Sequence, residues 1–309
     1  MSNDQKARAA RKAKRARKQR KMNSNQNQGT KKKQQPRRRI PKVGKLSKLA
    51  VSIMNPEKAP GTRWPDLGTQ PTVTYQTRWY LEVTTGTAGT YAVVVHPSLY
   101  LGTYIDNTFA TLSSANSFVG GNWPAYTAVT ATYNASRCVG LSLSFNCTQN
   151  ALNAQGELII SQVPQSTPAV ILPSSMAQQL NSDIMHERLP LARTIGNDVY
   201  VYAKPLDIVA KEFKSIGSFS GEGWNSIVFA VIGTAASTRV GTIEVVANWE
   251  LLVKPEGLAI GAEMPAREDP SYVQRALDAV YDMPNITCGT VALGTYLAGQ
   301  YVYDRVMRR

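Results

Sequence analysis

The sequence predicts an all-β body that follows a strongly basic segment and precedes a helical one. Three long stretches alternate apolar and polar residues, which is the pattern of a strand with one face buried in a core. These stretches are residues 72–83, 137–148 and 240–253. Shorter apolar stretches, bounded by Gly, Pro, Asn and Ser, predict further strands. They are residues 90–96, 156–163, 198–204 and 225–232, with an eighth, less regular strand at 184–194.

Eight strands joined by long loops favour an eight-stranded jelly-roll sandwich, in which two Greek keys wrap around one core. An immunoglobulin-like sandwich or another barrel is the alternative. Residues 173–182 suggest one short helix in a long connection. No repeat period favours a propeller.

The first 48 residues differ from the rest of the chain in charge. They hold 19 of the 35 lysines and arginines and only Asp4 among the 21 acids, so this segment carries +18 and the remainder −4. The first aromatic residue is Trp64, and large aliphatic residues are almost absent before Ile40. Such a segment cannot offset the entropy of ordering by burying apolar surface. Residues 1–48 are therefore predicted to be a disordered basic arm.

A basic arm without aromatic rings suits a phosphate backbone of any sequence, because Lys and Arg bind phosphate without reading bases. RNA is therefore the partner that we expect for the arm. A nuclear import signal or a polybasic membrane-binding segment is the alternative. The expected RNA-binding residues are Lys6, Arg8, Arg11, Lys12, Lys14, Arg15, Arg17, Lys18, Arg20, Lys21, Lys31, Lys32, Lys33, Arg37, Arg38 and Arg39.

Beyond the last strand the pattern becomes helical. Apolar residues recur at helical spacing from Pro270 to Pro284, which predicts a helix, with Glu268 and Asp269 at its N-terminus. Residues 286–309 are apolar, end in basic residues, and predict a buried terminal helix or one that contacts a membrane transiently. The predicted parts are an arm (1–48), a lead-in segment (49–71), a jelly-roll domain (72–255) and a helical C-terminal extension (256–309).

No pattern in the sequence indicates an enzyme, a metal or another cofactor. The two histidines and three cysteines lack metal-ligand spacing, and we expect Cys138, Cys147 and Cys288 to be reduced. No nucleophile with a base partner and no phosphate-binding loop is present. The sequence has no signal-peptide pattern and no apolar run of eighteen residues, so we expect a soluble chain made in the cytosol.

The order of these parts resembles the coat proteins of small icosahedral positive-strand RNA viruses, nodaviruses in particular, with the broader tombusvirus-like group close behind. Three stretches carry the resemblance: a Pro-rich lead-in at 55–66, a Gly-led strand at 150–164, and a final strand with an acidic, Pro-containing exit at 249–269. The resemblance implies a structural capsid protein that self-assembles, in many copies, into a shell around single-stranded genomic RNA. It also implies location in the virion and assembly in the host cytoplasm.

A cellular RNA-binding β-domain protein with a basic tail is the alternative function. Such a domain is expected to add exposed aromatic and basic residues on a sheet face. The body of this chain instead carries −4, and its Arg and Lys residues are scattered. The sequence therefore favours the capsid protein.

Nodavirus coat proteins also cleave themselves once, when an Asp near the start of the shell domain assists cleavage after an Asn near the C-terminus. In this sequence Glu57 stands nearest to the position of that Asp, and Asp66 is a second candidate. Asn285 is the only Asn beyond residue 250, but the β-branched Ile286 follows it and hinders attack. We favour a turn after Pro284 as the role of Asn285.

Some capsids of this kind bind calcium between subunits through clustered carboxylates. Four aspartates of this chain lie in or beside predicted loops, but none belongs to a DxDxD pattern, so the sequence gives calcium no support. They are Asp106, Asp183, Asp198 and Asp207.

Overall fold

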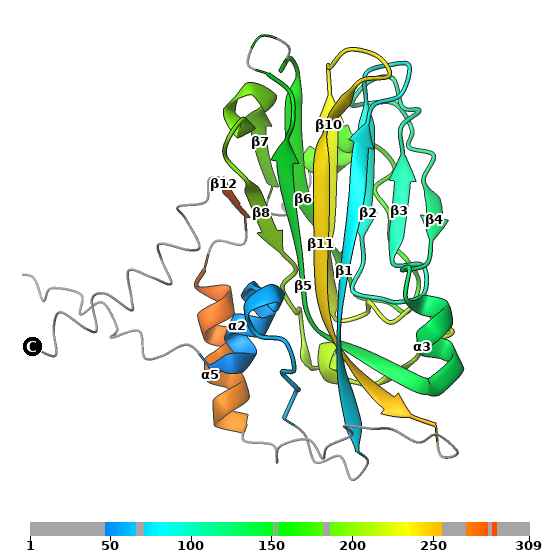
Figure 1. Cartoon of the computed structure of the whole chain (residues 1–309), viewed down its shortest axis with the longest axis vertical. Coiled ribbons are helices and arrows are strands. Elements are labelled where there is room, and N and C mark those ends of the chain that lie inside the picture. The colour runs from blue at the N-terminus through cyan, green and yellow to red at the C-terminus, as the bar shows by residue number, and fades with distance from the viewer. Residues whose placement is uncertain are drawn as a thin grey trace, which may run out of the picture. The chain divides into compact units, whose positions relative to one another are not determined.

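A computed structural model describes residues 47–65, 71–150, 152, 154–181, 186–254, 270–283 and 286–288. Within these residues the chain forms two antiparallel sheets, with helices beside them (Figure 1). The predicted RNA-binding residues of the arm all lie outside the described residues.

The first sheet, sheet A, has the strand order β1-β11-β5-β8-β12, and β9 pairs with β5. Its strands are β1 (Thr72–Thr84), β5 (Tyr133–Cys147), β8 (Val199–Tyr202), β9 (Lys214–Ser215), β11 (Arg239–Val253) and β12 (Ile286–Cys288). The second sheet, sheet B, has the order β4-β3-β2-β10-β6-β7. Its strands are β2 (Tyr91–Val95), β3 (Thr103–Asp106), β4 (Val119–Gly121), β6 (Glu157–Gln165), β7 (His186–Pro190) and β10 (Trp224–Ile232).

The strand order confirms the predicted jelly roll. The eight predicted strands are β1, β2, β5, β6, β7, β8, β10 and β11. The first and last of these, β1 and β11, are neighbours in sheet A, and β2 and β10 are neighbours in sheet B. In each sheet, the first of the predicted strands therefore pairs with the last one, as two Greek keys require.

Several short strands were not predicted from the sequence. Strands β3, β4, β9 and β12 each have four residues or fewer, and β4 contains two glycines, so they show no alternation that a pattern could reveal. Strand β12 also corrects one expectation, because a terminal helix was predicted from residue 286 onward. Residues 286–288 instead extend sheet A by pairing with β8, and the rest of that segment lies outside the described residues.

The main core fills the space between the sheets. Alternate residues of β5 face sheet B, and the ring of Phe145 packs 4.9 Å from the ring of Phe229 in β10. Trp249 of β11 is fully buried, packs edge-on against Trp123 at 5.5 Å, and donates its indole N–H to Thr77 Oγ1 at 2.8 Å. Each such buried ring contributes roughly 2–3 kcal/mol to folding.

The described residues also form four α-helices and three short 3₁₀ helices. The α-helices are α2 (Lys48–Met54), α3 (Tyr126–Thr132), α4 (Met176–Asn181) and α5 (Pro270–Tyr281). The 3₁₀ helices are η1 (Pro56–Lys58), η2 (Leu191–Thr194) and η3 (Ile208–Lys211). Helix α4 confirms the helix suggested at 173–182, and α5 confirms the helix predicted from Pro270. The described helices include none that is long and apolar enough to span a bilayer.

Helices α2 and α5 pack together over the face of sheet A that points away from sheet B (Figure 1). Ser47 caps α2, because its Oγ accepts the Ala50 N–H at 3.1 Å. Gly140 of β5 allows the close approach of α2, since a Cβ there would lie 1.9 Å from the carbonyl oxygen of Ser52. Buried Leu49, Ala50 and Ile53 form the apolar side of α2.

Candidate functional site: the arm anchor and the helical face

Helix α2 is the first described element of the chain, and it lies on the face of sheet A that α2 and α5 cover, which we call the helical face. Two groups of contacts fix the part of the lead-in segment that connects α2 to β1. They involve the side chain of Asn248 and the pair Arg137–Glu250.

Asn248 of β11 holds the end of α2 and the turn after it. Its buried amide donates to Ser52 Oγ at 2.8 Å and to the carbonyl oxygens of Pro56 and Ala59 at 2.9 and 3.1 Å. Gln76 of β1 adds a bond from Nε2 to the Pro56 carbonyl at 2.9 Å. Asn248 of β11 alone thus contacts three positions, Ser52, Pro56 and Ala59.

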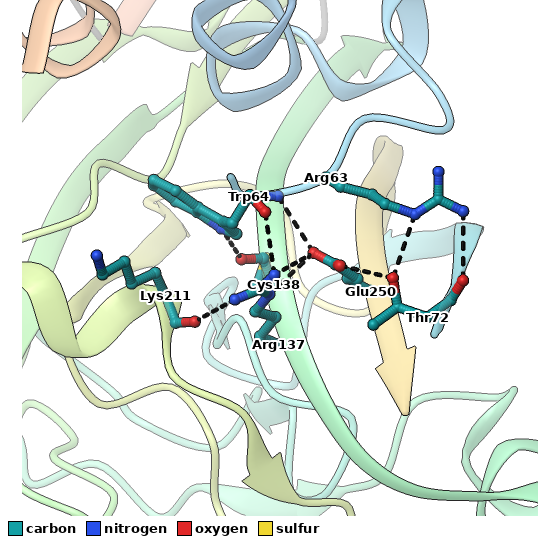
Figure 2. Close-up of polar contacts among 7 residues, drawn as sticks. All are labelled: Arg63, Trp64, Thr72, Arg137, Cys138, Lys211 and Glu250. Atoms are coloured by element: carbon teal, nitrogen blue, oxygen red, sulfur yellow. Dashed lines mark hydrogen bonds and ion pairs between the residues drawn. The ribbon is translucent and has the colours of Figure 1, made fainter. Parts of the chain in front are cut away.

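The second group, which we call the arm anchor, centres on Arg137 and Glu250 (Figure 2). These side chains are 2 % and 0 % exposed, and their shortest N–O distance is 2.8 Å. Glu250 also accepts the backbone N–H of Trp64 at 3.1 Å and the Thr72 hydroxyl at 2.7 Å. A buried carboxylate is tolerated only when paired and hydrogen-bonded in this way. The pair therefore ties Trp64 of the lead-in segment and Thr72 at the start of β1 to β11.

The guanidinium of Arg137 has further partners from two other segments. It donates to the Trp64 carbonyl at 3.1 Å and to the Lys211 carbonyl at 2.8 Å (Figure 2). It also lies 4.2 Å above the centre of the Phe213 ring, which adds a cation–π contact. Arg137 thus joins the lead-in segment, β11 and the end of η3 in one network.

Trp64 completes the arm anchor by packing. Its ring is 2 % exposed, donates its N–H to the Cys138 carbonyl at 2.8 Å, and packs edge-on against Trp224 at 6.4 Å. The first aromatic residue of the chain is therefore the point at which the lead-in segment enters the core.

The C-terminal end of α5 is fixed on the same face by Tyr202 of β8 and by Lys204, which follows that strand. Tyr202 donates its hydroxyl to the carbonyl oxygens of Val280 and Met283 at 3.1 and 3.3 Å. Lys204 donates from Nζ to the carbonyl oxygens of Tyr281 and Met283 at 3.3 and 2.9 Å. Burial lowers the pKa of Lys204, and nearby Asp282 opposes that shift. These bonds satisfy carbonyl groups that a helix end leaves unpaired.

The candidates for self-cleavage are only partly described. Asp66 and Asn285 lie outside the described residues. Glu57 lies on η1, is exposed, and forms an ion pair with Arg78 at 2.7 Å, while Arg78 also contacts Glu244 at 3.1 Å. Glu57 is thus close to the helical face and engaged in a surface ion pair.

The three described aspartates named for calcium have local structural partners. Asp106 is buried and accepts N–H bonds from Thr108 and Ser117 at 2.8 and 2.7 Å. Asp198 accepts from the Asn146 amide, and Asp207 accepts the Val209 N–H. Asp183 lies outside the described residues. In the described part of the chain no three His, Cys, Asp or Glu residues group as metal ligands.

One pair of side chains has the residue types of a catalytic site but lacks access to solvent. His96 Nδ1 lies 2.5 Å from Ser226 Oγ, and both residues are fully buried. The ring packs edge-on against Tyr104 and Phe219, and burial lowers the His96 pKa to about 3. A substrate does not reach this pair, so its role is in packing. Cys138 and Cys147 are free and buried, as expected of reduced residues.

Comparisons with known proteins agree with this architecture. No protein-family profile matches the sequence, and no curated protein matches it. Among solved structures, the chain is similar to the VP2 subviral particle of infectious bursal disease virus, with a TM-score of 0.54 and 11% identity over 84% of this chain and 100% of that chain. It is also similar to T=1 particles derived from the same virus, with a TM-score of 0.51 and 10% identity over 84% and 96% of the two chains.

The chain has the jelly-roll fold of viral capsid proteins. A third structure, of the Gx strain of infectious bursal disease virus, gives a TM-score of 0.50 and 12% identity over 83% of this chain and 100% of that chain. At such identities the likeness concerns the fold. It extends over nearly the whole length of the viral chains, so the shared architecture includes more than one sheet or motif.

Proposed function

We propose that this chain is a nodavirus-like coat protein that assembles in many copies into an icosahedral shell and packages single-stranded RNA. The observation that carries the proposal is the joining of a capsid-type jelly roll to a +18 arm in one chain. The jelly roll supplies a wall, and the arm supplies charge without sequence preference. Closed symmetry multiplies the charge, since sixty arms would carry on the order of a thousand positive charges.

The arm anchor supports an orientation for this wall. The arm starts at α2, and α2 is held on the helical face of sheet A by Gly140, Asn248 and the Arg137–Glu250 pair. If the arm binds packaged RNA, that face points to the interior. The opposite sheet, sheet B, then lies nearer to the outside.

Expression of the full chain tests the proposal directly. We expect particles that sediment far faster than a 33.8 kDa monomer, appear closed under the electron microscope, and contain nuclease-protected RNA. Only monomers or dimers across a range of salt and pH would overturn it and would favour the cellular RNA-binding protein. Deletion of residues 1–39 should leave a jelly roll that packages much less RNA or forms shells of altered size. Unchanged RNA content would refute the role of the arm.

The proposal includes location in the virion after assembly in the host cytoplasm. It leaves the C-terminal segment, residues 286–309, as the part that would contact a membrane. Self-cleavage at Asn285 would release that segment, and mass spectrometry of purified particles detects such a cut as a loss of residues 286–309. An intact chain in mature particles would exclude the cleavage.

A further inference from the structure

Three large apolar side chains are exposed around one turn of the described structure. Seven such side chains are exposed in the described residues, and most of the others are isolated from one another in sequence. The exposed fractions are 37 % for Leu206, 67 % for Ile208 and 45 % for Tyr281. The Tyr281 hydroxyl donates to the Pro205 carbonyl, so the end of α5 and the turn at 205–208 form one surface. We call Leu206, Ile208 and Tyr281 the turn patch.

The turn patch is held in a defined conformation by bonds to the core. The Leu206 N–H donates to the Gly223 carbonyl at 2.6 Å, and Asp207 Oδ1 accepts the Val209 N–H at 2.7 Å. The buried Trp224 ring donates to the Ala210 carbonyl at 3.2 Å. A fixed apolar surface loses little conformational entropy when a partner covers it, so it favours binding.

Gly223 shows how close this packing is. It has a φ of +83°, and a Cβ there would lie 2.5 Å from the backbone nitrogen of Ala210. Both the conformation and the space require glycine. The turn is thus built against the core, and yet Ile208 at its tip faces solvent.

The charges around the turn patch indicate the chemistry of its partner. Asp207 lies between Leu206 and Ile208, and Asp282 follows Tyr281. Lys204, which packs against the same helix end, is buried and donates to two carbonyl groups. Lys211, at the end of η3, adds a positive charge, so the rim of the turn patch carries both signs. Such a rim suits a protein surface better than the uniformly anionic surface of RNA or of an acidic lipid layer. An apolar patch with a polar rim is typical of a protein–protein contact.

We infer that the turn patch is a contact between subunits, covered in the shell by a second copy of this chain. The inference rests on the proposed function, because a closed shell supplies neighbouring copies at every side of the wall. Three side chains form the centre of a contact and not the whole of it, since a standard interface buries about 800 Å² on each partner. Ile208, the most exposed of the three, is the residue whose loss should weaken assembly most.

Substitution of Ile208 by aspartate tests the inference in the full chain. We expect I208D to fold with an unchanged Tm, because the side chain is already exposed, and to form at least about tenfold fewer particles than the wild type. Leu152 is 89 % exposed and distant in sequence from the turn patch, so L152D is the matched control. The control should assemble as the wild type does. I208L, which keeps the apolar surface, should assemble nearly normally.

The outcomes separate the inference from the proposed function. If wild-type protein and I208D both form particles in equal yield, the turn patch is not a contact and the capsid function stands. If the wild type forms no particles, the capsid function fails and this inference fails with it. Hydroxyl-radical footprinting adds an independent readout, in which Tyr281 and Leu206 should be protected in particles relative to free subunits. Equal labelling in both states would also overturn the inference.

Discussion

Replacing Arg137 by methionine should strongly destabilise the body. The substitution keeps an apolar chain of similar length but removes the guanidinium, which lies at 2.8 Å from the Glu250 carboxylate. Glu250 is fully buried and would retain only the Trp64 N–H and the Thr72 hydroxyl. The carbonyl groups of Trp64 and Lys211 would also lose a donor.

The magnitude follows from the burial of the pair. Breaking one partner of a buried ion pair costs about 3–5 kcal/mol, because the other charge stays unpaired away from water. For a body of this size the corresponding loss in Tm is on the order of 10 °C. The double variant R137M/E250L removes both charges and should recover part of that loss.

Urea unfolding of dissociated subunits measures this effect without the contribution of assembly. Arg78 provides the matched control, because it also pairs with glutamate on sheet A but is 40 % exposed. We expect R78M to cost at most about 1 kcal/mol. If R137M and R78M lower the free energy of unfolding equally, the anchor does not carry the stability that its geometry indicates.

Further predictions concern three other positions. Burial lowers the His96 pKa from its usual 6.5 to about 3. Between pH 6.5 and pH 3, His96 is therefore protonated in the unfolded chain and neutral in the folded chain. Stability from His96 is therefore complete above pH 6.5 and falls by about 1.4 kcal/mol per pH unit on acidification, and H96Q should remove that part of the slope. G140A should displace α2 from β5, because the added Cβ would meet the Ser52 carbonyl oxygen of α2, and should cost about 1–3 kcal/mol by urea unfolding. K204M should speed limited proteolysis next to Met283, because the ammonium donates to the Met283 carbonyl.

Two of these variants, G140A and K204M, have a control within the chain. A Cβ at Gly217 would meet nothing within 4 Å, so G217A should cost much less than G140A, and equal costs would contradict the close approach of α2. Lys254 donates to carbonyl groups far from α5, so K254M should leave proteolysis there unchanged. An unaltered pH slope in H96Q would show that other groups cause the acid sensitivity.

The jelly roll was predictable because its strands carry the period-2 alternation of a buried sheet face. β1, β5 and β11 are long enough for that pattern to be unambiguous, and they form the centre of sheet A. β3 and β4 were not predicted, since four and three residues are too few to show a period. The charge pattern also predicted a basic arm ahead of the body, and the residues predicted to bind RNA lie outside the described residues.

The arm anchor was not predicted, for a physical reason. Glu250 and Asn248 alternate with buried Trp249, so a period-2 pattern assigns them to the solvent side of β11. The lead-in segment and α2 cover that side, and both residues are buried. Their partners in the lead-in segment and β5 lie 113 to 196 residues away in sequence, a separation at which local patterns carry no information. A charged residue in an otherwise apolar strand end, as in "NWELLV", was the available signal.

Arg137 donates both to the Trp64 carbonyl in the lead-in segment and to the Lys211 carbonyl at the end of η3, the 3₁₀ helix that begins at Ile208. After the arm, the chain is held to sheet A at three successive points. Helix α2 packs on Gly140, Pro56 bonds to Asn248, and Trp64 bonds to Arg137. In the proposed shell, tension on an arm bound to RNA would therefore be carried by sheet A before it reached the turn patch. Chemically identical subunits could then place their arms differently while keeping the turn patch in one conformation.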